Sequence, residues 1–181
     1  MDITLQDIVT SRLTLRLLGT DVTEACLQYD FTTAAQLLQA TIPTEFQREQ
    51  SSLQHDRRQL SADPAYRPWA SRAILLRDEM IGLIRFHSRP EETPDQPYRL
   101  GAAELGYHIF AAHRRKGYAR EAIQGMLDWA TEYFHTRRFI VSIAPDNLPS
   151  LELARTLGFV KVDEAMDETD GLEYVYLLEN S

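Results

Sequence analysis

The stretch from Glu104 to Ala130 constrains the fold most, because it predicts a strand, a basic loop and a helix in direct succession. Residues 105–110 are mostly apolar or aromatic, which is typical of a buried or half-buried strand. The apolar residues that follow recur at the spacing of one helical face: Ala119, Ala122, Ile123, Met126, Leu127 and Ala130. Because the first amides of a helix lack intrahelical partners and favour an anion, a basic loop at that point predicts a phosphate-binding site. A solvated basic turn is the alternative interpretation.

The composition limits the classes of protein to which the chain can belong. Its 181 residues predict a single domain over 1–181. A net charge of -8 and a pI near 5.1 argue against nucleic acid as a partner. Against that acidic background, the positive charges of Arg114, Arg115, Lys116 and Arg120 are a local exception that suits an anionic cofactor.

The same sequence gives no sign of a membrane or an oxidising compartment. No apolar run approaches the roughly 20 residues that cross a bilayer, and the N-terminal segment lacks the pattern of a signal peptide. Cys26 is the only cysteine, so an intrachain disulfide is excluded. We therefore expect a cytoplasmic protein that does not bind membranes.

Strand and helix patterns alternate along the chain. Helices are predicted at about 21–28, 31–40, 44–60, 119–130 and 148–157, and a proline-rich loop at 88–97. Strands are predicted at 12–18, 69–76, 80–87, 98–110, 138–143, 159–162 and 173–178. This order predicts a mixed sheet in an α/β or α+β domain.

Two motifs carry a resemblance to a known family. Arg114, Gly117 and Ala119 form Arg-x-x-Gly-x-Ala, which resembles the acyl-CoA pyrophosphate loop of the GNAT family of N-acetyltransferases. After the next strand, Asn147-x-x-Ser150 and a Leu-Gly-Phe sequence at 157–159 resemble a later motif of the same family. The opening SRLTLRLL and the strand ELGYHI resemble the branch of ribosomal-protein N-terminal acetyltransferases (RimJ/RimL-like). The two motifs span roughly 103–162.

The resemblance implies a fold and a place for the cofactor. The fold would be an α/β (α+β) domain with a twisted, mixed and mostly antiparallel sheet of about seven strands. Helices would cover both faces, and the two central strands would splay near Phe110 and Ile143. Acetyl-CoA, the acyl-donor co-substrate, would lie in that gap. Its pantetheine would pair with backbone groups of Ile109, Phe110 and Ala111.

The pyrophosphate would then lie on the loop and the first helical turn. The family's motif assigns cofactor contacts there to Arg114, Arg115, Lys116, Gly117, Tyr118, Ala119 and Arg120. Asn147 resembles the asparagine that holds the pantetheine arm. As an alternative or an additional role, Asn147 would cap the helix that follows it.

Acetyl transfer to an amine also requires a group that takes the amine's proton and donors for the tetrahedral oxyanion. Amides beside Phe110 are candidates for the oxyanion donors. Strand alternation places Glu104, Gly106 and His108 on one face. Glu104 is therefore the candidate base, directly or through water, and His108 is the second candidate. A strand-edge salt bridge and cleft packing are their respective structural alternatives.

The resemblance implies a serine as general acid, where many family members use a tyrosine at another position. Ser150 resembles the serine that has this role in the ribosomal-protein branch, whereas the tyrosine position is Ala154 here. Alternatively, Ser150 bonds an amide in the first turn of its helix. No cluster has the spacing of a metal site, and we expect no metal.

The sequence thus predicts an acetyl-CoA-dependent N-acetyltransferase that acts on a primary amine by direct attack in a ternary complex. The acceptor would be a protein N-terminal α-amine or a small-molecule amine. Two alternatives stay open, which are a non-catalytic acyl-CoA-binding regulatory or interaction module and a transferase that uses another donor such as succinyl-CoA. The resemblance is compatible with a homodimer.

Overall fold

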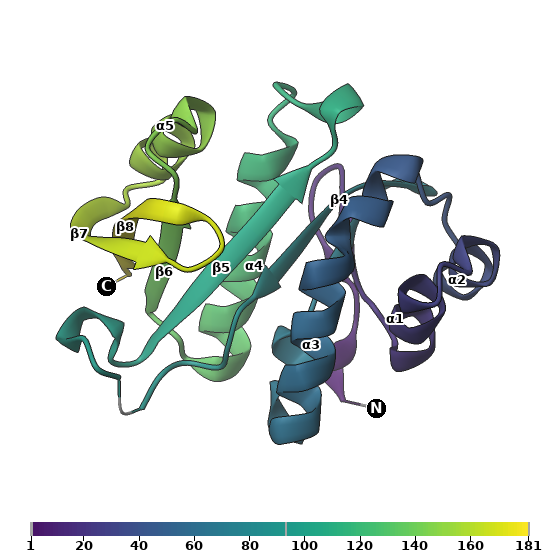
Figure 1. The fold of residues 1–181 in the computed structure, drawn as a ribbon, viewed down its shortest axis with the longest axis horizontal. Helices are drawn as coiled ribbons and strands as arrows, with labels where there is room; N and C mark the ends of the chain where they lie inside the picture. Colours follow the sequence, from purple (N-terminus) through teal and green to yellow (C-terminus); the bar gives the residue numbers. More distant parts are fainter. Residues whose placement is uncertain (1, 93, 181) are drawn as a thin grey trace.

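A computed structural model describes residues 2–92 and 94–180, and its centre is a mixed sheet (Figure 1). The strand order is β1-β2-β3-β4-β5-β6-β8-β7. The bounds of these strands are β1 Ile8–Val9, β2 Thr14–Leu17, β3 Arg72–Leu76, β4 Glu79–Phe86, β5 Ala102–Ile109, β6 Arg138–Ile143, β7 Val160–Asp167 and β8 Gly171–Glu179. The described residues therefore form eight strands where about seven were predicted, and the short edge strand β1 is the addition.

The segment predicted as one helix at 44–60 is α-helical only from Gln50, after a 3-10 turn, and the other α-helices are close to the predicted ranges. Their bounds are α1 Thr20–Leu27, α2 Phe31–Leu38, α3 Gln50–Ala62, α4 Tyr118–Phe134 and α5 Leu148–Thr156. Short 3-10 turns lie at η1 Ile3–Leu5, η2 Thr44–Glu49, η3 Pro64–Trp69, η4 Pro97–Arg99 and η5 Ala111–His113.

The sheet opens between its two central strands, as predicted. β5 and β6 are the parallel pair, and their register runs only from Ala102↔Arg138 to Glu104↔Ile140. β4 stays paired with β5 as far as Ile109, so the C-terminal half of β5 has a strand on one side alone. Figure 1 shows β5 and β6 diverging toward the N-terminus of α4 and toward α5.

Helices cover both faces of the sheet. On one face, α4 and α5 pack on side chains such as Ile84 and Leu105. On the other face, α1, α2 and α3 pack on Leu75, Leu83 and Phe110. The amphipathic pattern of α4 explains its position, since Ala122, Ile123, Met126, Leu127 and Ala130 are all buried.

Three further predicted boundaries differ from the structure. Trp69 lies in η3 rather than at the start of a strand, and is buried against Phe86 and Trp129. β5 begins at Ala102 rather than at 98, because Pro97 starts a 3-10 turn and Gly101 has a φ of 68°. The closing pair β7–β8 is longer than predicted, since a tight turn in which Asp167 accepts from two amides joins two extended strands.

Candidate active site

The loop between β5 and α4 has the geometry of an anion site. Gly117, at φ 81° and ψ 2°, is left-handed and is the N-cap residue of α4. Arg115 also has a positive φ, of 60°. Two left-handed residues bring the amides at the start of α4 to the end of β5, and glycine contributes no side-chain cap that would compete with a ligand. The N-terminus of a 17-residue helix thus borders the same space as the side chains of Arg114, Arg115 and Arg120.

A cavity of about 620 Å³ lies at that junction, in the gap between β5 and α5. We call it the β5 cavity. Its lining comprises Tyr107, His108, Ile109, His113, Arg114, Arg115, Gly117, Tyr118, Ala119, Arg120, Asn147, Pro149, Ser150 and Leu153. The splay of β5 from β6 therefore brings together residues of both sequence motifs, although the first of them, Arg114, and the last, Ser150, lie 36 positions apart.

Four sequence-predicted residues are not among those that line the cavity. Phe110 is buried on the α1–α3 side, and its amide donates to the Ile81 carbonyl of β4. The amide of Ala111 donates to the Glu45 carboxylate at 3.0 Å. Lys116 Nζ donates to the Ala112 carbonyl within the loop. Glu104, the fourth, lies nearer the N-terminal end of β5.

Ile109 has the backbone orientation that a ligand strand would need. Its neighbour Phe110 pairs with β4, so the alternation of the antiparallel ladder turns the N–H and C=O of Ile109 toward the gap. Arg114 already uses that carbonyl, because its Nε donates to the oxygen of Ile109 at 2.9 Å.

His108 lies where two cavities meet. It lines the β5 cavity and also a smaller cavity of about 130 Å³ under α3, bordered by Glu49, Ser52, Arg85 and His87. The Nδ1 atom of His108 is 2.6 Å from Glu49 Oε1, and its Nε2 atom is 2.9 Å from Arg114 Nη2. We call the second space the α3 cavity.

Glu104 is held by its neighbours. Its Oε2 accepts from Arg99 at 2.8 Å and its Oε1 accepts from the Ser142 hydroxyl at 2.6 Å, with His87 Nδ1 3.9 Å away. Burial raises the pKa of Glu104, but the charges and hydrogen bonds of His87, Arg99 and Ser142 lower it below its ordinary value. The carboxylate is therefore ionised and in an ion pair, and it lines neither cavity. The strand-edge salt bridge that the sequence left open is present.

Asn147 and Ser150 lie at the start of α5. The Asn147 side chain accepts from the Ser150 amide at 3.3 Å, so the predicted N-cap is formed. The same two residues line the β5 cavity opposite Ile109.

Tyr107 was not singled out from the sequence. It lies on β5 in the β5 cavity, where burial raises its pKa and the nearby Ser150 opposes that rise. Strand alternation could have placed Tyr107 on the same face of β5 as Ile109. The absence of the family's tyrosine, at Ala154, was a reason to look for another tyrosine near the sulfur.

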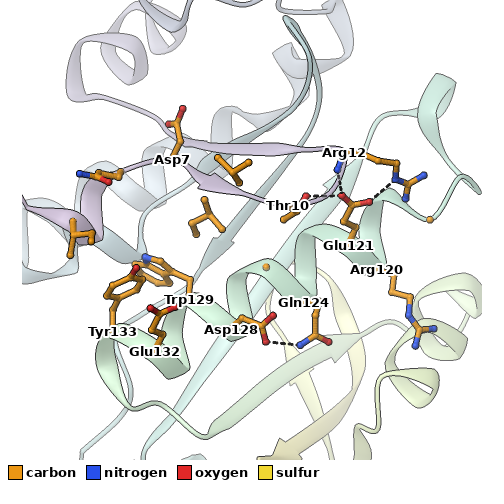
Figure 2. A pocket seen from close by; sticks show the side chains of 16 residues that line it. Asp7, Thr10, Arg12, Arg120, Glu121, Gln124, Asp128, Trp129, Glu132 and Tyr133 are labelled. Atoms are coloured by element: carbon orange, nitrogen blue, oxygen red, sulfur yellow. Dashed lines mark hydrogen bonds and ion pairs between the residues drawn. The ribbon is translucent and has the colours of Figure 1, made fainter.

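A larger groove of about 730 Å³ lies elsewhere, between the N-terminal segment 3–12 and the outer face of α4. Figure 2 shows that Glu121 fills one end, where it bonds Thr10 and Arg12, while Gln124 bonds Asp128. The groove contacts Gly117 and Arg120 at that end. Four acids line this groove (Asp7, Glu121, Asp128 and Glu132) against two arginines, so it suits a phosphate-bearing ligand less well than the β5 cavity, which is the better candidate for the active site.

Within residues 2–92 and 94–180, no group of three His, Cys, Asp or Glu side chains is arranged to hold a metal ion. In the same residues, no helix combines the length and apolarity needed to span a bilayer.

Comparisons with known proteins agree with this geometry. A family model described as the acetyltransferase (GNAT) domain matches residues 12–160. The chain is 33% identical over 84 residues to the uncharacterized N-acetyltransferase p20 of Bacillus licheniformis. That alignment covers 46% of this chain and 43% of the relative, so the chain matches less than half of the relative's length.

Solved structures resemble the whole fold. One, described provisionally as a ribosomal-protein-serine acetyltransferase from Vibrio cholerae, has a TM-score of 0.65 at 22% identity and covers 97% of this chain and 98% of its own. Another, the ribosomal L7/L12 α-N-protein acetyltransferase RimL in complex with coenzyme A, has a TM-score of 0.65 at 18% identity, with 96% and 98% covered. At these identities the likeness shows the fold.

Proposed function

The chain belongs to the acetyltransferase (GNAT) family, and from that premise we propose that it transfers the acetyl group of acetyl-CoA to a primary amine. The observation that carries the proposal is the β5 cavity, in which an uncapped helix N-terminus, a basic loop and the open side of β5 face one space. Its volume of about 620 Å³ lies within the roughly 300–1,000 Å³ of small-molecule sites.

Two parts of acetyl-CoA, the pyrophosphate and the pantetheine arm, would each have partners in the β5 cavity. The pyrophosphate would accept from amides between Arg115 and Arg120, with the dipole of α4 and the surrounding basic side chains opposing its charge. The pantetheine would pair with the C=O of Ile109, which leaves the N–H of Ile109 for the oxyanion, and Asn147 would hold the arm from the α5 side. Arg114 would leave the Ile109 carbonyl when the cofactor enters and turn toward the phosphates.

The chemistry is a direct attack of the amine on the thioester. A nitrogen–carbon bond forms between amine and acetyl group, the amine loses a proton, the carbon–sulfur bond breaks, and the coenzyme leaves as a thiolate that takes up a proton. The Ile109 amide is directed toward the developing oxyanion. Ser150, with Tyr107 beside it, is the candidate donor to the sulfur.

Between the two predicted bases, the geometry favours His108. His108 borders both cavities, so a substrate in either can reach its ring. Both oxygens of Glu104 are engaged by Arg99 and Ser142, and an ion-paired carboxylate with a lowered pKa is a weak base. Glu104 acting through water remains the second candidate.

The acceptor would approach from the α3 side. Glu45 and Glu49 lie on that side next to His108, where they attract an ammonium group before it loses its proton. This acidic approach suits the N-terminal α-amine of a protein as well as a small amine, and both belong in the first screen.

A binding measurement followed by a transfer assay tests the proposal. The purified chain is titrated calorimetrically with acetyl-CoA, succinyl-CoA and CoA, and is then incubated with acetyl-CoA and a panel of small amines and N-terminal peptides. Thiol release and mass spectrometry of the acceptor report transfer. Acetyl-CoA binding with acceptor-dependent thiol release supports the enzyme. Binding without transfer to any acceptor supports the regulatory module, preferential transfer from succinyl-CoA changes the donor, and absence of binding overturns the proposal.

A further inference from the structure

His108 is held from both sides of its imidazole ring. Arg114 Nη2 lies 2.9 Å from Nε2, and Glu49 Oε1 lies 2.6 Å from Nδ1. An arginine side chain carries only donors, so Nε2 is the acceptor in the first contact. The hydrogen of the neutral ring is then on Nδ1, and it is donated to Glu49. The two contacts together select one tautomer of His108.

Glu49 is itself fixed in place. It is the last residue of η2, directly before α3, and its side chain is 12% exposed. The Ser52 hydroxyl donates to its second oxygen at 3.1 Å. Burial raises the pKa of Glu49, but the hydrogen bond and charge of His108, together with Ser52 and Arg85, bring it below the ordinary value. Glu49 is therefore a held carboxylate rather than a mobile surface acid.

We propose that Glu49 is a positioning residue for acetyl transfer. Its carboxylate accepts the Nδ1–H of His108, and this contact directs the unprotonated Nε2 atom into the β5 cavity. The inference rests on the proposed function, and it assigns a role to a residue outside the sequence motifs. Glu49 is 59 positions from His108 in the sequence, and only the packing of η2 and α3 on the open end of β5 brings the two together.

The contact acts on the proton transfer. When the amine attacks the acetyl carbon, its proton passes to Nε2, and the resulting imidazolium keeps its Nδ1–H on the Glu49 carboxylate. The carbon–sulfur bond breaks and the thiolate leaves with its electron pair. A carboxylate at 2.6 Å stabilises the imidazolium and keeps the ring from rotating away.

The other charged groups around the ring come from several elements. Glu45, from η2, lies 3.6 Å from Nε2, and Arg114 lies on the same side. Arg85 and His87, from β4 and its end, border the α3 cavity beside the ring. Arg114 occupies Nε2 in the free protein, so its movement toward the cofactor phosphates would free that atom for the amine.

The test compares Glu49→Gln and Glu49→Asp with the wild-type chain. Glu49→Gln keeps the shape and removes the charge, and we expect kcat to fall about 10- to 100-fold, less than the roughly 100- to 10,000-fold that a general base contributes. The affinity for acetyl-CoA should stay within about twofold. Glu49→Asp should recover part of kcat.

A matched control is Glu79→Gln, which removes the carboxylate partner of another histidine, His113, at 3.1 Å. The Glu79 side chain is 50% exposed at the start of β4. We expect kcat and the position of the His108 ring hydrogen to stay unchanged in that variant.

A second measurement needs no turnover. Nitrogen-15 NMR of the histidine rings, with the His108 signal assigned from a His108→Gln variant, reports which nitrogen carries the hydrogen. We expect hydrogen on Nδ1 in the wild-type chain and a mixture of tautomers in Glu49→Gln. Hydrogen on Nε2 in the wild-type chain, or an unchanged kcat in Glu49→Gln, overturns the inference. If the wild-type chain transfers no acetyl group to any acceptor, the proposed function is refuted instead. The NMR spectrum of the histidine rings still decides whether Glu49 selects the tautomer of His108.

Discussion

Gly117 offers a sharp test of the phosphate site. There is room for a side chain at this position, so two substitutions of similar size can differ in their charge alone. A Cβ at this position would meet only the Nη2 atom of Arg12, at 3.3 Å, which is the far end of a flexible side chain. The cost of any side chain is therefore mainly that of the left-handed backbone, about 1–2 kcal/mol. For a chain of this size, that cost lowers the Tm by about 2–8 °C.

Gly117→Gln and Gly117→Glu should thus lose similar stability but bind acetyl-CoA differently. A carboxylate about 5 Å from one phosphate charge costs about 0.8 kcal/mol at the dielectric constant of water and about 3 kcal/mol at an effective value of 20. The dissociation constant of Gly117→Glu should then exceed that of Gly117→Gln by a factor between about 4 and 140.

The assay is calorimetric titration of both variants with acetyl-CoA, alongside thermal unfolding. Raising the ionic strength toward 1 M should shrink the difference between the variants, because the screening length falls to about 3 Å. Equal dissociation constants for Gly117→Gln and Gly117→Glu at low salt would show that no phosphate lies against this loop.

Three further changes test other parts of the account. Asn147→Ala should cost about 1 kcal/mol of stability by loss of the N-cap of α5 and should also weaken acetyl-CoA binding, whereas Asn147→Ser should recover the thermal stability without the binding. Gly82→Ala should destabilise the chain by about 1–3 kcal/mol in denaturant unfolding, since its Cβ would lie 2.3 Å from the backbone oxygen of His108, whereas Gly19→Ala, with open space around it, should cost less. Burial and the nearby Arg85 lower the pKa of His87 from 6.5 to about 4, so the unfolded state binds more protons than the folded state in that window. Stability should then fall as the pH drops from about 6.5 to 4, and His87→Asn should have a shallower slope; identical slopes in unfolding measurements would contradict this assignment.

Local patterns were sufficient to predict the half of the site that lies on regular elements. The 3.6-residue periodicity after Gly117 predicted α4, and β6 was predicted at its observed bounds of Arg138–Ile143. The loop motif and Asn147 lie together because β5 and β6 diverge, which the family resemblance implied. Strand alternation also correctly placed Glu104 and His108 on one face, since their contacts lie on the α3 side.

The other half of the site depends on tertiary packing that no local pattern reports. Glu45 and Glu49 lie in a 3-10 turn where a polar α-helix was predicted, and they reach His108 only because η2 folds over the end of β5. The ion pair of Glu104 with Arg99 arises because Pro97 and Gly101 turn the chain back beside β5, where a longer strand was predicted. The sequence could therefore name both candidate bases, but their partners distinguish them.

A crystal structure of the chain with bound CoA tests the central claim most directly. We predict the coenzyme in the β5 cavity, with its pyrophosphate on the amides between Arg115 and Arg120, its pantetheine along Ile109, and its sulfur near His108 and Ser150. Coenzyme bound instead in the groove outside α4, or with its sulfur remote from His108, would contradict the site and the chemistry assigned to it.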